Sequence, residues 1–93
     1  MAEEFFSIAV PVKHYRPDNS VTKEQVQFKI SRQDKEFIAI PLMSKEERLT
    51  TGLPEKLEFI YINPCIASAN DMEEDSLDAI KEIILELEAQ EFL

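Results

Sequence analysis

The chain has 93 residues, of which 44% are hydrophobic and 31% charged, and its formal net charge is -9 at pH 7. This composition predicts one globular domain over residues 1–93. The chain contains one Gly, which argues against a glycine-rich phosphate loop. No apolar run reaches the ~20 residues that a membrane span requires. Because the lone Cys65 cannot form an internal disulfide and the acidic N-terminus does not resemble a signal peptide, we expect a cytoplasmic protein.

The first predicted element is a strand over Phe5–Val12, where apolar and β-prone residues predominate. Pro11 favours an edge position or a strand end, because proline cannot donate to a β-ladder. Turn-forming residues fill His14–Ser20. Apolar and polar residues then alternate through Gln25–Ser31, which indicates a half-buried strand, although a short helix beginning at Thr22 is the alternative.

A hairpin and a short helix are expected in the middle of the chain. The polar segment Arg32–Lys35 predicts a connection of four or five residues, and Glu36–Leu42 returns as a strand. Ser44 and Glu47 have the spacing of a capping box, and Gly52 stands where a helix C-cap glycine belongs. These signals predict a helix of one to two turns near residues 45–50.

Two further strands are expected before the C-terminal segment. Leu57–Ile62 places Leu57, Phe59 and Tyr61 on one face, and Ile66–Ser68 forms a last short strand.

The C-terminal segment Asp71–Glu91 predicts an amphipathic helix, with Asp71 as its N-cap and Glu74 at the N3 position. Its apolar residues follow helical spacing, so one side should pack on a sheet. We therefore predict an α+β fold, an antiparallel sheet of three to five strands with one face covered by this helix. The apolar stripe consists of Leu77, Ile80, Ile83, Ile84 and Leu87.

The negative charge is concentrated in the second half of the chain. Residues 1–50 hold eight Lys/Arg and eight Asp/Glu, whereas residues 51–93 hold two Lys and eleven Asp/Glu. Such an excess argues against direct nucleic-acid binding, which requires cations to neutralise phosphates. It fits a basic protein partner, or an ordinary solvated surface. The predicted partner-facing residues lie on a separate face of the C-terminal helix: Asp75, Asp78, Glu82 and Glu86.

His14 and Cys65 are the only residues of their kinds, and together they could supply a nucleophile and its base. Nothing in their spacing brings them together. We expect instead a buried, inert Cys65 and a His14 in an exposed turn, hence no enzyme. No metal-binding motif is present, so neither a metal nor another cofactor is expected.

From residue 63 onward the sequence resembles antitoxins of the HicB group. Those proteins have a strand, a Pro-Gly-Cys-like turn, a short strand, a Gly-Asp-Thr step and an acidic helix start. The corresponding segments here are Asn63–Ser68 and Asn70–Glu74, followed by the helical positions Leu77, Ile80 and Ile84.

This chain also departs from the family pattern. Pro64 and Asn70 replace the two glycines, Met72 replaces the threonine, and one residue is inserted before Asn70. The match covers about a third of the chain, residues 63–87, and the longer N-terminal half does not fit the family's brief opening hairpin. The resemblance implies a protein that masks a basic RNA-cleaving toxin. It provides no catalytic residues, and we expect no counterpart of the family's frequent C-terminal DNA-binding segment.

The predicted function is thus a non-enzymatic protein-interaction domain, an inhibitor or antitoxin-like regulator of a basic protein. One alternative is a homodimer formed through Phe92-Leu93 and the exposed edge of Phe5–Val12. The other alternative is a small-ligand or enzymatic domain that uses Cys65 or His14.

Overall fold

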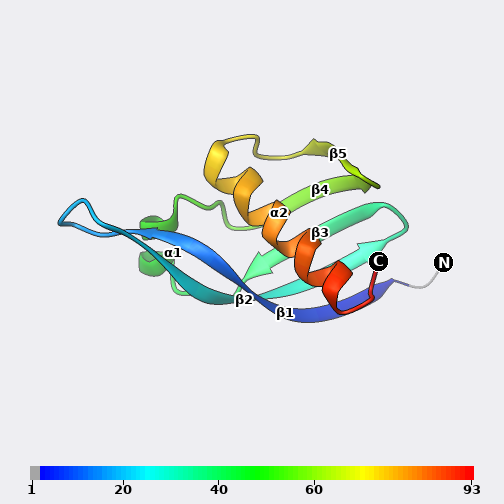
Figure 1. The fold of residues 1–93 in the computed structure, drawn as a ribbon, viewed down its shortest axis with the longest axis horizontal. Coiled ribbons are helices and arrows are strands. Elements are labelled where there is room, and N and C mark those ends of the chain that lie inside the picture. Colours follow the sequence, from blue (N-terminus) through cyan, green and yellow to red (C-terminus); the bar gives the residue numbers. More distant parts are fainter. Residues whose placement is uncertain (1–2) are drawn as a thin grey trace.

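The computed structural model describes residues 3–93 as a five-stranded antiparallel sheet with a long helix, α2, lying across one face (Figure 1). The strands follow one another across the sheet in chain order, so that β1 and β5 form its two edges. A short helix, α1, packs on β1, and α2 packs mainly on β1 as well. The predicted α+β class is confirmed. The elements are β1 Glu4–Tyr15, β2 Val21–Gln33, β3 Glu36–Pro41, α1 Lys45–Thr51, β4 Leu57–Ile62, β5 Cys65–Ala69 and α2 Glu74–Ala89.

β1 and β2 form a long hairpin whose far end projects beyond the rest of the sheet (Figure 1). Their pairing runs without a break from Glu4 opposite Arg32 to Tyr15 opposite Val21. Both strands are therefore longer than the apolar patterns indicate, and the alternative helix beginning at Thr22 is absent. Pro11 lies in an edge strand, as predicted.

The connection between β2 and β3 is shorter than predicted. Gln33 pairs with Glu36, which leaves only Asp34 and Lys35 in the turn. Asp34 adopts a left-handed φ of 58°, a conformation that aspartate tolerates better than most residues. The absence of Gly or Asn from this turn hides the two-residue hairpin from sequence inspection.

The predicted short helix is confirmed as α1. Ser44 is its N-cap, with the side chain accepting a hydrogen bond from the backbone N of Glu47 at 3.1 Å. Gly52 ends the helix with a left-handed φ of 73°, where a side chain would be strained.

The last hairpin joins β4 to β5 through residues 63–64, and both strands occur where the sequence predicts them. Ile60 pairs with Ser68 and Tyr61 with Ile66, so Ala67 is the extra residue of a β-bulge.

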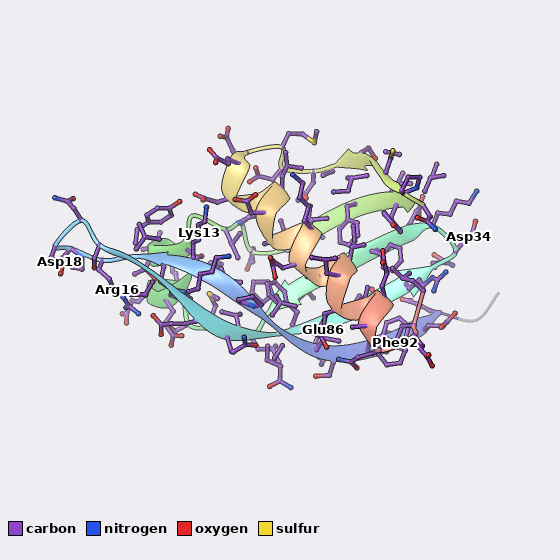
Figure 2. All side chains as sticks on the ribbon, viewed as in Figure 1. Lys13, Arg16, Asp18, Asp34, Glu86 and Phe92 are labelled. Atoms are coloured by element: carbon purple, nitrogen blue, oxygen red, sulfur yellow. The ribbon has the colours of Figure 1, made fainter. Side chains whose placement is uncertain are left out.

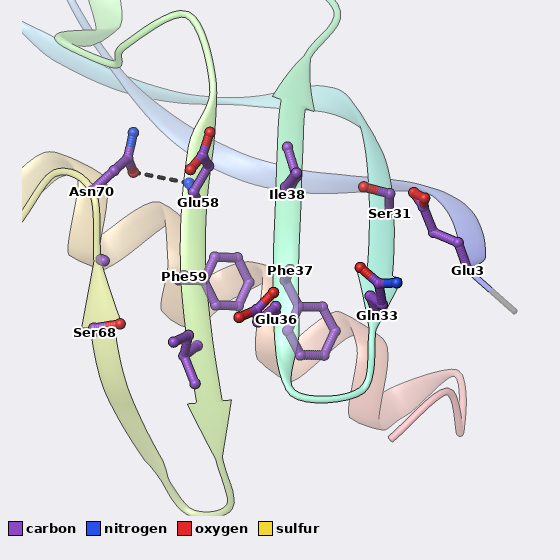
Figure 3. A pocket seen from close by; sticks show the side chains of 12 residues that line it. Glu3, Ser31, Gln33, Glu36, Phe37, Ile38, Glu58, Phe59, Ser68 and Asn70 are labelled. Atoms are coloured by element: carbon purple, nitrogen blue, oxygen red, sulfur yellow. Dashed lines mark hydrogen bonds between the residues drawn. The ribbon is translucent and has the colours of Figure 1, made fainter. Parts of the chain in front are cut away.

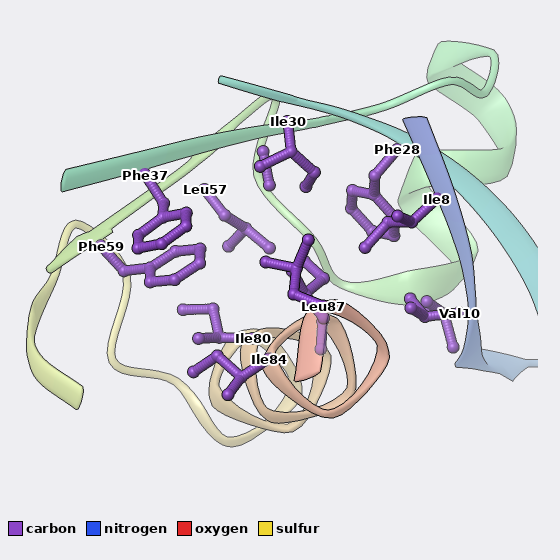
Figure 4. Close-up of a cluster of buried hydrophobic side chains, with 14 of the residues drawn as sticks. Ile8, Val10, Phe28, Ile30, Phe37, Leu57, Phe59, Ile80, Ile84 and Leu87 are labelled. Carbon is purple, nitrogen blue, oxygen red and sulfur yellow. The ribbon is translucent and has the colours of Figure 1, made fainter. Parts of the chain in front are cut away.

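The core lies between α2 and the covered face of the sheet (Figure 4). Ile80, Ile83 and Leu87 are fully buried, whereas Leu77, at one side of the predicted stripe, is half-buried. Phe37 and Phe59 stack on adjacent strands with ring centroids 5.1 Å apart. Burial of a large apolar side chain contributes roughly 1.5–3 kcal/mol, so these contacts fix the position of the helix.

The predicted N-cap of α2 is wrong. Glu73 is the N-cap and makes no capping hydrogen bond with its side chain. The carboxylate of Asp71 accepts a hydrogen bond from the backbone N of Glu73 at 2.9 Å, so it stabilises the turn before the helix instead.

Two buried hydroxyl groups differ in their hydrogen bonding: one has no partner and the other has two. Within residues 3–93, the Ser76 hydroxyl on α2 has no hydrogen-bond partner although the residue is fully buried. The Thr51 hydroxyl, in contrast, donates to the carbonyl of Arg48 at 2.6 Å and accepts from the backbone N of Leu53 at 3.2 Å.

We predict that Ser76→Ala raises the free energy of unfolding by roughly 1 kcal/mol, because it removes a buried unpaired hydroxyl and introduces a better helix former. Thr51→Ala is the matched comparison and should lower the same quantity by about 1–3 kcal/mol, since it leaves a donor and an acceptor unpaired. Urea unfolding followed by circular dichroism measures both changes. Destabilisation by Ser76→Ala would contradict the assignment of an unpaired hydroxyl.

Candidate functional site

The predicted acidic row occupies one flank of α2, which turns toward β1 over its N-terminal half. Figure 2 labels Glu86, the last residue of the row, and Lys13 on β1. Helical spacing separates this flank from the buried side, and each of the four residues is half-buried. The row consists of Asp75, Asp78, Glu82 and Glu86.

Part of this row is already bonded to β1. The Nζ of Lys13 lies 3.4 Å from Oδ2 of Asp78, and the hydroxyl of Tyr15 donates to Oδ1 of Asp75 at 2.6 Å. Sequence inspection missed both contacts, because these partners are 65 and 60 residues away in the chain. The only available signal was that Lys13 and Tyr15 lie near the end of a predicted strand.

The other half of the row has no partner in the sheet. Glu86 accepts a hydrogen bond from Gln90 on the last turn of the same helix. Within residues 3–93, the Glu82 carboxylate accepts no hydrogen bond and forms no ion pair. These two carboxylates remain available to an incoming cation.

A hollow of about 260 Å³ lies between α2 and the β1–β2 hairpin. Asp75, Asp78 and Glu82 line it from the helix, and Lys13 and Lys23 line it from the strands. Lys81 of α2 also lines it, so three members of the row share one concave site with three lysines. A cationic side chain from another protein could bind these carboxylates in place of one of the lysines.

A second hollow, of about 400 Å³, lies on the face of the sheet that α2 does not cover (Figure 3). Its lining mixes carboxylates such as Glu36 and Glu58 with Ile38 and Ile60. Glu58 is engaged by Lys56, whose Nζ lies 2.8 Å from Oε1. Antiparallel sheets commonly expose one such face to water. Among residues 3–93, moreover, no group of three His, Cys, Asp or Glu side chains is arranged to hold a metal ion.

The structure does not bring His14 and Cys65 together. His14 lies in β1 and Cys65 in β5, the two edges of the sheet. The expected positions of both residues are wrong. His14 is buried, with Nδ1 3.0 Å from the carbonyl oxygen of Val12, because β1 continues to Tyr15, into the segment predicted as a turn. Cys65 is exposed, since it directly follows the turn between β4 and β5.

The C-terminal residues proposed for a dimer contact pack partly against their own chain. The ring centroid of Phe92 lies 4.4 Å from that of Phe6, and its carbonyl oxygen accepts a hydrogen bond from Arg32 at 2.8 Å (Figure 2).

Comparisons with protein-family models, with curated proteins and with solved structures give no match. The resemblance of residues 63–87 to HicB-type antitoxins therefore stays a prediction; these residues form the last turn of the sheet, β5 and most of α2. No helix within residues 3–93 is long and apolar enough to cross a membrane.

The contact between Tyr15 and Asp75 gives a prediction about titration. The hydrogen bond to Asp75 raises the pKa of Tyr15 above its ordinary value of 10.0, with further contributions from desolvation and nearby carboxylates. A raised folded-state pKa means that this stabilisation is fully present below the unfolded-state pKa and is lost as pH rises through the folded one.

The pKa of Tyr61 is also raised, by desolvation and by its hydrogen bond to Glu88, so Tyr61→Phe isolates the Tyr15 signal. In that background, ultraviolet absorbance should show phenolate formation with a midpoint above pH 10, and Asp75→Asn should lower the midpoint. An unchanged midpoint after Asp75→Asn would show that Asp75 does not control this titration.

Proposed function

We propose that the protein is a non-enzymatic interaction domain that binds a basic protein through the acidic flank of α2. The observation that carries this proposal is the convergence of Asp75, Asp78 and Glu82 on one hollow beside β1. These carboxylates can bind a cationic side chain of the partner in exchange for the lysines that share the hollow.

The arrangement of charge along α2 supports a role beyond stability. The last turn of the helix contains no basic residue, although Glu86 and Glu88 lie close to its negative end. Carboxylates in that position are unfavourable by roughly 0.3–1 kcal/mol each, because they face the negative end of the helix dipole. Folding alone therefore does not favour them. A basic partner would compensate for this cost and would also associate faster by electrostatic attraction.

The proposed contact begins at Glu82 and Glu86, which have no partner in the sheet. An arginine of the partner fits this role best, since its guanidinium can bind a carboxylate through two parallel hydrogen bonds. A second cation entering the hollow would compete with Lys13 for Asp78. That exchange requires little free energy, because an exposed ion pair such as Lys13–Asp78 contributes at most about 1 kcal/mol to stability.

The resemblance to HicB-type antitoxins suggests one class of partner, a small RNA-cleaving toxin. An RNA-binding surface is basic because it must neutralise phosphates. The acidic row would cover such a surface by presenting carboxylates where the RNA presents phosphates. Under this proposal the protein is an inhibitor, and its effect is steric and electrostatic rather than catalytic.

Affinity capture from a cell lysate tests the proposal. We expect the wild-type chain to retain a basic protein that elutes as salt rises, because exposed charge pairs are screened. A variant combining Asp75→Asn, Asp78→Asn, Glu82→Gln and Glu86→Gln should lose at least roughly tenfold in affinity for that protein.

The matched control neutralises four exposed acids elsewhere and so changes the net charge equally. Loss of the partner from the row variant with retention by the control supports the acidic flank. Retention by both variants, or equal loss from both, overturns the proposal. The control combines Glu36→Gln, Glu46→Gln, Glu55→Gln and Glu91→Gln.

A further inference from the structure

The opposite flank of α2 borders an apolar hollow of about 740 Å³, between the helix and the β4–β5 hairpin. Its lining is mainly apolar and comes from both elements. Met72 and Leu85 are 62% and 60% exposed, although both border this hollow. Isolated exposed apolar residues are ordinary, but a continuous apolar hollow marks an interaction surface. The side chains that matter here are Ile66, Met72, Leu77, Ile84 and Leu85.

Two charged residues border the same hollow, Lys81 and Glu88. Lys81 is the only basic residue of α2, and it lies between the two flanks, because it lines both this hollow and the one beside the acidic row. The two residues are seven positions apart, which is about two helical turns, and Ile84 and Leu85 lie midway between them. When two such helices run antiparallel, the basic residue of each can lie opposite the acidic residue of the other, and the apolar residues meet between them.

We propose that a second copy of this chain covers the hollow, with the two α2 helices antiparallel about a two-fold axis near Ile84 and Leu85. Lys81 of each copy then lies opposite Glu88 of the other, and the contact is the same on both sides, as two-fold symmetry requires. The apolar side chains at the centre are buried by the same contact.

The distribution of charge favours a second copy as the occupant. Each chain carries a net charge of -9, so two copies repel unless their acidic surfaces face apart. The acidic row lies on the other flank of α2, beside β1. Pairing through the apolar flank therefore keeps the acidic rows of the two copies apart and places Lys81 of each copy near Glu88 of the other.

The sheet edges are less suitable for self-association. β5 has only five residues and contains a bulge at Ala67, two features that discourage edge-to-edge pairing. The other edge, β1, contains Pro11 near its middle, which cannot donate a hydrogen bond to another strand.

Sedimentation velocity over a wide concentration range tests the dimer without requiring any unidentified partner, so its outcome is independent of the acidic-row proposal. We expect the wild-type chain to sediment as a dimer at high concentration. Leu85→Glu should abolish the dimer, whereas Leu49→Glu, at a 76% exposed leucine of α1, should leave it intact. Circular dichroism checks that both variants remain folded.

A charge exchange provides the sharper test. Lys81→Glu or Glu88→Lys alone places like charges opposite each other and should weaken the dimer on the order of tenfold or more. The double variant restores opposite charges and should recover dimerisation. Since Glu88 also accepts a hydrogen bond from Tyr61 at 3.2 Å, Tyr61→Phe controls for that loss.

A monomer at every concentration, a dimer that survives Leu85→Glu, or a double variant as weak as the single ones would each overturn the proposal. A monomeric chain would also indicate that the hollow, if it is covered at all, is covered by a different protein.

Discussion

The packing of α2 on the sheet is the contact on which the rest of the structure depends. Ile80, Ile83 and Leu87 are fully buried against strands that are distant in sequence. Substitution of such residues by alanine costs about 2–5 kcal/mol in typical cores, which is a large share of the stability of a small domain. The rotation of the helix about its own axis is thereby fixed. Once that rotation is fixed, the position of every other side chain on the helix follows.

Two surfaces of different chemistry result from this single orientation. The flank beside β1 presents carboxylates, the flank beside the β4–β5 hairpin presents apolar side chains with Glu88, and Lys81 borders both. Lys81 is the one residue of α2 that lines both hollows, and the other residues of each flank are different. A basic partner and a second copy of the chain could therefore bind together, each on its own side of α2.

Local patterns predicted most of the fold. The alternation in Gln25–Ser31, the capping residues Ser44 and Gly52, and the stripe on α2 all correspond to observed structure. The predictions that were wrong concern features that long-range strand pairing determines. β1 and β2 extend beyond their apolar parts because backbone hydrogen bonding continues between them, and the same extension places His14 in a strand rather than a turn.

For the acidic row, too, the local pattern was predicted from the sequence and the long-range contacts were not. Helical spacing was enough to place four carboxylates on one side of α2. It could not indicate that Lys13 and Tyr15 reach two of them, because the β1–β2 hairpin must first fold against the helix. The apolar hollow was missed for a related reason: Met72 and Leu85 lie outside the predicted stripe, and only the neighbouring hairpin makes them part of one surface.

The contacts from β1 also reduce the repulsion within the acidic row while no partner is bound. Four carboxylates on one helix flank repel one another, and the repulsion is strongest at low salt. Lys13 and the Tyr15 hydroxyl relieve it at Asp78 and Asp75, both near the start of the helix. No equivalent contact from the sheet reaches Glu82 or Glu86 within residues 3–93. The strongest unrelieved negative potential is therefore expected over the second half of α2, and an approaching cation would be attracted there first before it competes with Lys13.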